Sequence, residues 1–286
     1  MAEKILVTGA SGRVGRELVR QLVGTGVEVK AGTRRPDRAA SLFAGVVEVV
    51  ELDYDRTETW DEAVQWADRV FLVPPPFDPR ADERLVPFLD WAVQSGARHL
   101  VLLSAMGVET REQLALHRVE RRIERTGVPR TFLRPNIYMQ NFARGFVRRD
   151  IRDHSAFRLP AGVGAVSFVD SRDVAAVAAA VLADDAHMGR SYTLTGPEAL
   201  TSDQAAATIA RVLGREVRYE PIGADALEDR LVEEGWPREE AAVFVGLMTA
   251  VREGHRAAVT DDVRAVIARE PRSFQNFAVE RVATWR

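Results

Sequence analysis

The feature that most constrains the fold is the alternation of short β-branched runs with amphipathic helical stretches over residues 1–135. Such alternation is typical of βαβ units, which build a parallel sheet with helices on its faces. The runs are almost continuously apolar, as expected for strands covered on both sides. Strands are predicted at residues 4–8, 27–31, 46–51, 69–73, 99–104 and 130–134.

Helices are predicted between these strands because apolar residues recur there at helical spacing. Leu116, Val119 and Ile123 form one such series, and the turn Gly127-Val-Pro129 follows it as a helix stop. The fold class predicted is therefore α/β, with a Rossmann-like, doubly wound parallel sheet. The helical ranges expected in this part are 12–24, 36–43, 58–66, 80–95 and 110–126.

After Pro135 the alternation loosens, and a second, smaller lobe is predicted. Thr201-Ser-Asp-Gln204 is a capping box that predicts a helix over 202–213. The resulting division is a Rossmann domain of residues 1–136 with 166–200, and a discontinuous C-terminal lobe of residues 137–165 with 215–286. Further helices are expected at 173–183, 224–235, 238–252 and 260–269, and strands at 191–195 and 217–222.

Composition excludes several classes of function. The 286 residues are 46% hydrophobic with a net charge of -3, which favours a sizeable core and gives no reason to expect nucleic acid or an anionic membrane as partner. With no Cys, and five His at spacings unlike those of metal ligands, no disulfide, thiolate nucleophile or metal site is expected. Neither a signal peptide nor a membrane span is recognisable, so we expect a soluble, cytoplasmic protein. A small-molecule substrate is the expected partner, and a monomer or a homodimer is the expected assembly.

A glycine turn follows the first predicted strand. Gly9 permits a tight turn, Gly12 lets the backbone approach a pyrophosphate at the helix N-terminus, and Gly15 permits close packing of helix on strand. The spacing is G-x-x-G-x-x-G, and its place between the first strand and a helix predicts nucleotide binding. The residues expected to contact the cofactor here are Thr8, Gly9, Ser11, Gly12, Arg13, Val14 and Gly15.

The end of the second strand indicates which dinucleotide binds. An NAD site would place Asp or Glu there for the ribose 2′-hydroxyl, and none is present. Arg34, with Arg35 beside it, instead offers a planar bidentate donor for a 2′-phosphate, so NADP(H) is predicted. A solvated arginine cluster is the alternative.

Two later loops are expected to meet the adenosine half of the cofactor. Asp53 and Tyr54 follow the third strand near the adenine edge, and Val73 and Pro74 follow the fourth in a stiff loop over the ribose. For both pairs the alternative is an ordinary loop residue.

Together these motifs resemble the short-chain dehydrogenase/reductase superfamily, in its atypical NmrA-like and isoflavone-reductase-like branch. The resemblance covers most of the first 200 residues and implies a cofactor-binding fold for NADP(H). Family members include NADPH-dependent reductases and also NADP-binding regulators that catalyse nothing. The matching segments are Thr8–Gly15, Arg34–Pro36, Gly45–Val50 with Asp53, Leu133–Tyr138 with Asn141, Phe168–Ala175 and Tyr192–Pro197.

The superfamily's catalytic Tyr and Lys, four residues apart on one helix, are absent. The only lysines are Lys4 and Lys30, and no Tyr-x-x-x-Lys occurs anywhere. By the resemblance, Glu112 and Leu116 stand in the places of the pair. Ser104 lies near the position of the family's serine, although a small shift would put Met106 there.

Other residues are candidates to replace the missing acid or to contact the cofactor and the substrate. By the resemblance, Tyr138 lies in the segment beside the nicotinamide; a packed aromatic is the alternative. Pro135 and Asn136 are expected on the cofactor side and Asn141 on the substrate side, with Met106. His117 points about 100° away from the Leu116 position and is a candidate substrate contact or a surface residue.

One charged group and one group of aromatic and large apolar residues have a less specific interpretation. Glu120 and Glu124 mix with arginines along 118–125, which indicates a salt-bridged helix face. The aromatic and large apolar residues of the lobe either wall a substrate pocket or form its own core. They are Phe146, Phe157, Trp236, Phe244, Leu247 and Met248.

The function predicted is an NADPH-dependent reductase of a ketone or quinone carbonyl on a bulky, hydroxylated aromatic metabolite. The substrate or water would supply the proton, with Ser104 or Tyr138 assisting. The resemblance permits this, since some atypical members are ketoreductases of aromatic polyketides in natural-product biosynthesis and lack the pair. The alternative is a non-catalytic regulator that senses NADP(H) and binds a partner protein.

Overall fold

The chain folds into two compact units. In the computed structural model, residues 2–43 and 45–286 are described. The first unit, here called the sheet unit, comprises Met1–Pro75, Arg80–Arg134 and Ser171–Thr193. The second unit comprises Pro76–Pro79, Pro135–Asp170 and Leu194–Arg286.

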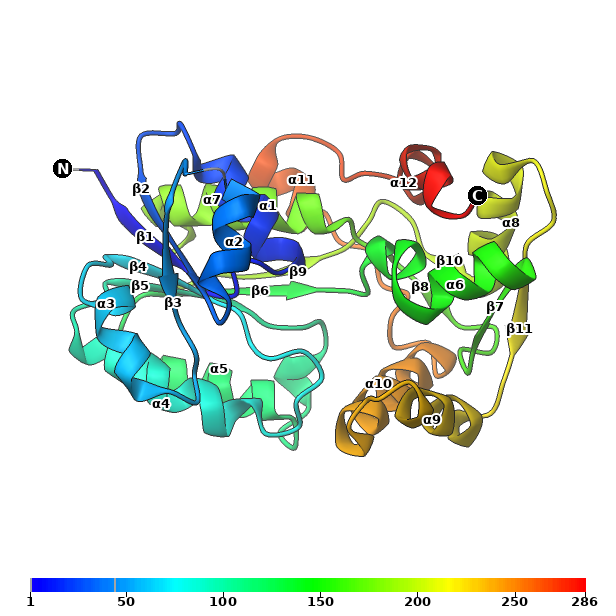
Figure 1. Ribbon diagram of the computed structural model, residues 1–286, viewed down its shortest axis with the longest axis horizontal. Coiled ribbons are helices and arrows are strands. Elements are labelled where there is room, and N and C mark those ends of the chain that lie inside the picture. The colour runs from blue at the N-terminus through cyan, green and yellow to red at the C-terminus, as the bar shows by residue number, and fades with distance from the viewer. Residues whose placement is uncertain (1, 44) are drawn as a thin grey trace. The chain divides into compact units, whose positions relative to one another are not determined.

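A seven-stranded parallel sheet forms the centre of the sheet unit, in the order β3-β2-β1-β4-β5-β6-β9 (Figure 1). The order runs outwards in both directions from β1, as in a doubly wound fold, so the predicted fold class is confirmed. Each of the six strands predicted up to Pro135 is present, with ends that shift by at most about two residues. The strands are β1 (Lys4–Val7), β2 (Glu28–Thr33), β3 (Glu48–Glu51), β4 (Arg69–Leu72), β5 (His99–Leu103), β6 (Arg130–Pro135) and β9 (Ser191–Leu194).

Helices cover both faces of this sheet. On one face α1 and α7 pack on each other; on the other, α3, α4 and α5 bury an apolar layer that includes Phe88, Leu100, Val119 and Ile123 (Figure 1). Their bounds are α1 (Arg13–Leu22), α2 (Pro36–Phe43), α3 (Trp60–Val64), α4 (Ala81–Gln94), α5 (Ala115–Thr126) and α7 (Ser171–Ala183).

The predicted helix over 110–126 begins too early. Gly107 has φ 79°, a short 3-10 turn occupies Val108–Thr110, and Leu114 is extended. The α-helix α5 therefore starts only at Ala115. As a result Glu112, placed by the resemblance in the tyrosine position, is exposed and lies before the helix.

The second unit is built from two short strand pairs and helices. Strands β7 and β11 pair in parallel, and β8 and β10 in antiparallel. The predicted capping box is present, since Thr201 and Gln204 exchange side-chain-to-backbone hydrogen bonds at the start of α8. The elements are α6 (Gly145–His154), β7 (Ala156–Leu159), β8 (Ala165–Val166), β10 (Leu200–Thr201), α8 (Ser202–Leu213), β11 (Arg218–Pro221), α9 (Ala224–Glu233), α10 (Arg238–Arg252), α11 (Asp262–Ile267) and α12 (Phe274–Arg281).

Aromatic side chains form the core of this second unit. Phe142 meets Phe157, Phe168 and Phe274 edge-on, with ring centroids 5.4, 5.2 and 5.0 Å away. Neither the strand of Phe157 nor the helix of Phe274 was predicted from the sequence. Of the residues weighed as pocket wall or core, Phe146, Phe157, Phe244 and Met248 lie in this core, and Trp236 and Leu247 pack against it.

No helix of the described residues is long and apolar enough to cross a membrane.

Candidate functional site

The glycine turn lies at the carboxyl end of β1. Gly9 has φ 58°, a left-handed conformation that favours glycine, and a Cβ there would sit 3.0 Å from the Cβ of Val73. A Cβ on Gly15 would lie 2.5 Å from the Gly9 carbonyl oxygen, so only glycine lets α1 approach the turn. The predicted roles of the two glycines, a tight turn at Gly9 and close packing of helix on strand at Gly15, are therefore present in the structure.

The turn leads into a helix whose first amides have no side-chain cap. Gly12 is the N-cap of α1, its amide donates to the Gly9 carbonyl at 2.8 Å, and its own carbonyl accepts from Arg16. No acidic residue stands in the first turn of α1. A helix start of this kind presents amide hydrogens and a positive dipole end to an anion, which fits a pyrophosphate. Contacts of Arg13 and Val14 with a cofactor stay predictions.

Thr8 holds the surrounding loops together rather than facing outwards. Its hydroxyl donates to the Phe71 carbonyl at 2.9 Å and accepts from the Val73 amide at 2.8 Å and from the Tyr54 hydroxyl at 2.7 Å. The side chain is fully buried. Thr8 and Tyr54 thereby join the carboxyl ends of β1 and β4 to the loop after β3. Burial raises the pKa of Tyr54 above its ordinary value, against the lowering effect of these hydrogen bonds.

The end of β2 carries two arginines that the fold does not use. Arg34 and Arg35 are exposed, and within residues 2–43 and 45–286 neither guanidinium has a hydrogen bond or an ion pair. The hydroxyls of Ser11 and Thr33 meet at 2.9 Å and tie the glycine turn to this strand end. The arginines therefore stand beside the turn with their donors available, as a 2′-phosphate would require.

The two later loops also lie at this edge of the sheet. Asp53 is half-buried; its carbonyl accepts from the Trp60 indole at 2.8 Å, and its carboxylate accepts from the Asp55 amide at 3.1 Å. Val73 and Pro74 directly follow β4, and Val73 walls the glycine turn. Their roles toward adenosine stay predictions.

A buried ionic network lies behind the end of β5. Ser104 donates its hydroxyl hydrogen to Glu120 Oε1 at 2.7 Å. Arg134 grips the same carboxylate with two donors, Nε to Oε1 at 3.0 Å and Nη2 to Oε2 at 2.6 Å. Burial disfavours the charge on Arg134, but Glu120 with Glu109 and Glu124 outweighs it and raises the pKa of the guanidinium.

The predicted salt bridge of Glu120 is present, with Arg134 as its partner. Its burial was not predicted, and the Glu120 side chain is completely buried. The signal was available in β6, where Arg134 continues a strand that runs Phe132-Leu133. A cation in a covered strand needs a buried anion close by.

Two other residues predicted for the substrate lie in the sheet unit. His117 is half-buried in α5, and its Nδ1 lies 3.0 Å from the Val108 carbonyl. Met106 is half-buried in the loop after β5. Both stay predictions as substrate contacts.

The remaining predicted residues belong to the second unit. The amide of Asn136 is buried, donating to Ser167 Oγ and the Arg256 carbonyl, both at 2.8 Å, and accepting from the amide of Ile137 at 2.9 Å. These hydrogen bonds give Asn136 a structural role within the second unit. Buried Pro135 and half-buried Tyr138 and Asn141 have no tested part in binding, and their roles stay predictions.

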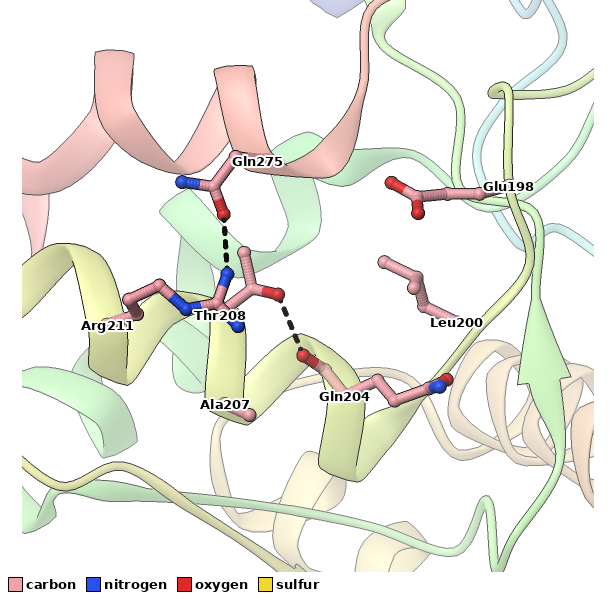
Figure 2. A pocket seen from close by; sticks show the side chains of 7 residues that line it. All are labelled: Glu198, Leu200, Gln204, Ala207, Thr208, Arg211 and Gln275. Atoms are coloured by element: carbon pink, nitrogen blue, oxygen red, sulfur yellow. Dashed lines mark hydrogen bonds between the residues drawn. The ribbon is translucent and has the colours of Figure 1, made fainter.

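Two hollows of the second unit differ in their relation to these residues. The first is lined by none of them, and the second, which Asn141 helps to line, is too small for a substrate. Figure 2 shows a polar surface hollow of about 410 Å³ beside α8 and α12, across which Arg211 donates to Gln275. A cavity of about 40 Å³ lies among apolar side chains that include Phe142, Phe168 and Met248. Within the described residues no group of three or more His, Cys, Asp or Glu side chains is placed to hold a metal ion.

Comparison with known proteins agrees with this site. A model described as the NmrA-like family matches residues 1–277 and confirms the predicted resemblance. A curated relative from Streptomyces griseus, (4-alkanoyl-5-oxo-2,5-dihydrofuran-3-yl)methyl phosphate reductase, is 38% identical over 96% of this chain and 97% of its own length. An NAD(P)H azoreductase from Xenophilus azovorans is 30% identical over 98% of this chain and 99% of its own.

A solved structure shares the fold. The triphenylmethane reductase of Citrobacter sp., solved in complex with NADP(H), superposes with a TM-score of 0.81 at 24% identity, covering 98% of this chain and 99% of that one. This likeness spans both units of the chain.

Proposed function

This chain belongs to the NmrA-like family, and we propose that within it the chain is an NADPH-dependent reductase. The sheet unit binds the dinucleotide, and the second unit, which holds most of the predicted lobe of 137–165 with 215–286, contributes substrate contacts. The hydride acceptor is a ketone, a quinone or a related electron-poor conjugated system on a bulky, hydroxylated aromatic molecule.

The observation that carries the proposal is the pair of exposed arginines after β2, whose guanidiniums make no hydrogen bond or ion pair within the described residues and which stand beside the glycine turn after β1. The uncapped start of α1 would hold the diphosphate, and Arg34 and Arg35 would hold the 2′-phosphate. Bound NADPH supplies a hydride. The chain's own part is to bind and orient both reactants, which accounts for several kcal/mol of rate enhancement (about 7–11 in well-ordered cases).

The absent Tyr-x-x-x-Lys pair favours particular acceptors. Losing a positioned general acid costs ~10²–10⁴ in rate, which is tolerable when the accepted electron pair is delocalised or the substrate carries its own acidic proton. Two relatives are named for a conjugated furanone and for azo compounds, and the structural neighbour for triphenylmethanes. Acceptors of this kind spread the incoming charge over an extended π-system, as a quinone also does.

A direct test is to incubate the protein with NADPH and a panel of quinones, hydroxyquinones and aromatic ketones. Loss of the dihydronicotinamide absorbance should be fastest with the quinones and should follow saturation kinetics. Tight NADPH binding without turnover across the panel would contradict the reductase. That result would favour the alternative of an NADP(H)-sensing regulator, which only the missing catalytic pair supports.

A further inference from the structure

The network behind β5 fixes the direction of one hydrogen bond. Glu120 is fully buried and accepts three hydrogen bonds, two of them from Arg134 and one from Ser104 at 2.7 Å. A carboxylate clasped by a guanidinium can only accept. The single hydrogen of the Ser104 hydroxyl must therefore point at Glu120.

This direction decides what Ser104 can offer to a ligand. Because the hydroxyl hydrogen is donated to Glu120, Ser104 Oγ can take part in further hydrogen bonds only as an acceptor, so any further partner has to be a donor. The usual part of a serine at this position, as donor to a carbonyl oxygen, would require breaking a charge-assisted bond. Because such bonds are about twice as strong as neutral ones, the present direction is the stable one.

Ser104 also lies at the edge of the sheet where a ligand would bind. It directly follows β5 at the carboxyl edge, where open α/β sheets bind their ligands, and although it is buried it retains 5% exposure. Thr8, which directly follows β1 at the same edge of the sheet, differs from Ser104. The Thr8 hydroxyl is completely buried and already accepts two hydrogen bonds from within the fold.

We propose that Ser104 is a specificity-determining acceptor, which selects aromatic substrates carrying a hydroxyl that donates to its Oγ. Glu120 and Arg134 are positioning residues that hold the serine hydrogen away from the substrate. The inference rests on the proposed function and specifies the substrate class of that same site, namely phenolic quinones and ketones rather than their deoxy counterparts.

The test compares two ligands that differ only in the donor. Protein loaded with NADP+ is titrated with naphthol and with fluoronaphthalene, in which fluorine replaces the hydroxyl at similar size. Wild type should prefer naphthol by about tenfold, the value of a well-made hydrogen bond. Ser104→Ala should remove the preference, Ser104→Thr should keep most of it, and Glu120→Gln should reduce it severalfold because a carboxamide can turn the serine hydrogen outwards.

A matched control separates this role from a structural one. Asp150→Asn alters an equally buried carboxylate held by Arg230 in the second unit and should leave the naphthol preference unchanged. No preference in the wild type, or a preference that survives Ser104→Ala, overturns the proposal. Turnover of quinones without the preference would leave the reductase standing, and the preference without turnover of any acceptor would leave Ser104 standing and refute the reductase.

Discussion

The two units treat their polar groups differently. At the carboxyl edge of the sheet unit, the guanidiniums of Arg34 and Arg35 make no hydrogen bond or ion pair within residues 2–43 and 45–286, and α1 begins without a side-chain cap. In the second unit several buried polar groups bind each other. Asp150, for example, is clasped by Arg230 through two bonds of 2.7 Å, and Arg230 also lies 4.9 Å over the Phe146 ring.

Glu120 and Asp150 make this contrast specific. Both are buried carboxylates held by one forked guanidinium, but only Glu120 also accepts from a hydroxyl at the ligand-binding edge. A buried ion pair is weak evidence for net stability and even weaker evidence for function. What distinguishes a structural pair from a functional one here is the third partner.

The largest expected loss of stability comes from substitutions that break either of the two ion pairs. Glu120→Ala and Asp150→Ala should each lower the free energy of unfolding by about 2–3 kcal/mol, because each removes the bidentate partner of a half-buried guanidinium. Within the described residues, Arg134 keeps only Glu109 at 3.5 Å, and Arg230 keeps only Glu234 at 3.4 Å. Urea denaturation measures the loss. Among molecules that remain folded, only Glu120→Ala should alter kcat/KM, and equal effects on turnover would abolish the distinction between the two pairs.

A glycine substitution sharpens the comparison at the backbone. Gly15→Ala forces a Cβ to within 2.5 Å of the Gly9 carbonyl oxygen and should cost about 1–3 kcal/mol together with dinucleotide affinity. Its control is Gly246→Ala in α10 of the second unit, where no described atom beyond the neighbouring residues and the backbone of the helix itself lies within 4 Å of the added carbon. There we expect the free energy of unfolding to rise by about 0.5–1 kcal/mol, which thermal denaturation would measure. A harmless Gly15→Ala would refute the close packing of turn and helix.

Acid sensitivity should also reside in the sheet unit. Burial, with the nearby Arg69, lowers the pKa of His99 from 6.5 to about 4. Because the unfolded chain binds the proton first, stability should fall as pH drops from about 6.5 to about 4, by roughly 1 kcal/mol per unit. His99→Gln should remove this component in pH-dependent denaturation, whereas His154→Gln, at an exposed position of the second unit, should not.

The smallest effect concerns cofactor choice. Arg34→Ala should lower the ratio of NADPH to NADH affinity by about tenfold, since one exposed charge-assisted contact is lost. Arg144→Ala, at an exposed arginine of the second unit, is the matched control and should leave the ratio unchanged. Isothermal titration of both dinucleotides measures it. An unaltered ratio in Arg34→Ala would remove the 2′-phosphate assignment.

The sheet unit was largely predictable from sequence, because its signals are local. A buried strand, a glycine turn and a helix follow one another within Lys4–Leu22, and each is specified by residues only a few positions apart. The strand pairs of the second unit were harder. Strands β8 and β10 are two residues long, too short to show any alternation.

Arg134 in a covered strand indicated a buried anion, but the identity of its partners around Ser104 could not be predicted from the sequence. Glu120 follows Val119 at the border of the apolar stripe of α5, so its helical position alone allows exposure or burial. Only the pairing of β5 with β6 places Arg134 and Ser104 against it. Side chains from residues 104, 120 and 134 meet through tertiary packing, for which helical periodicity gives no signal.

The central claim is that a phosphorylated dinucleotide binds the glycine turn, with its 2′-phosphate on the arginines after β2. Calorimetric titration of the wild-type protein with NADPH, NADP+ and NADH tests it most directly. The account predicts one site per chain, saturable by NADPH and NADP+ and at least tenfold weaker for NADH. No heat of binding with NADPH or NADP+, together with no displacement of a fluorescent dinucleotide, would contradict it.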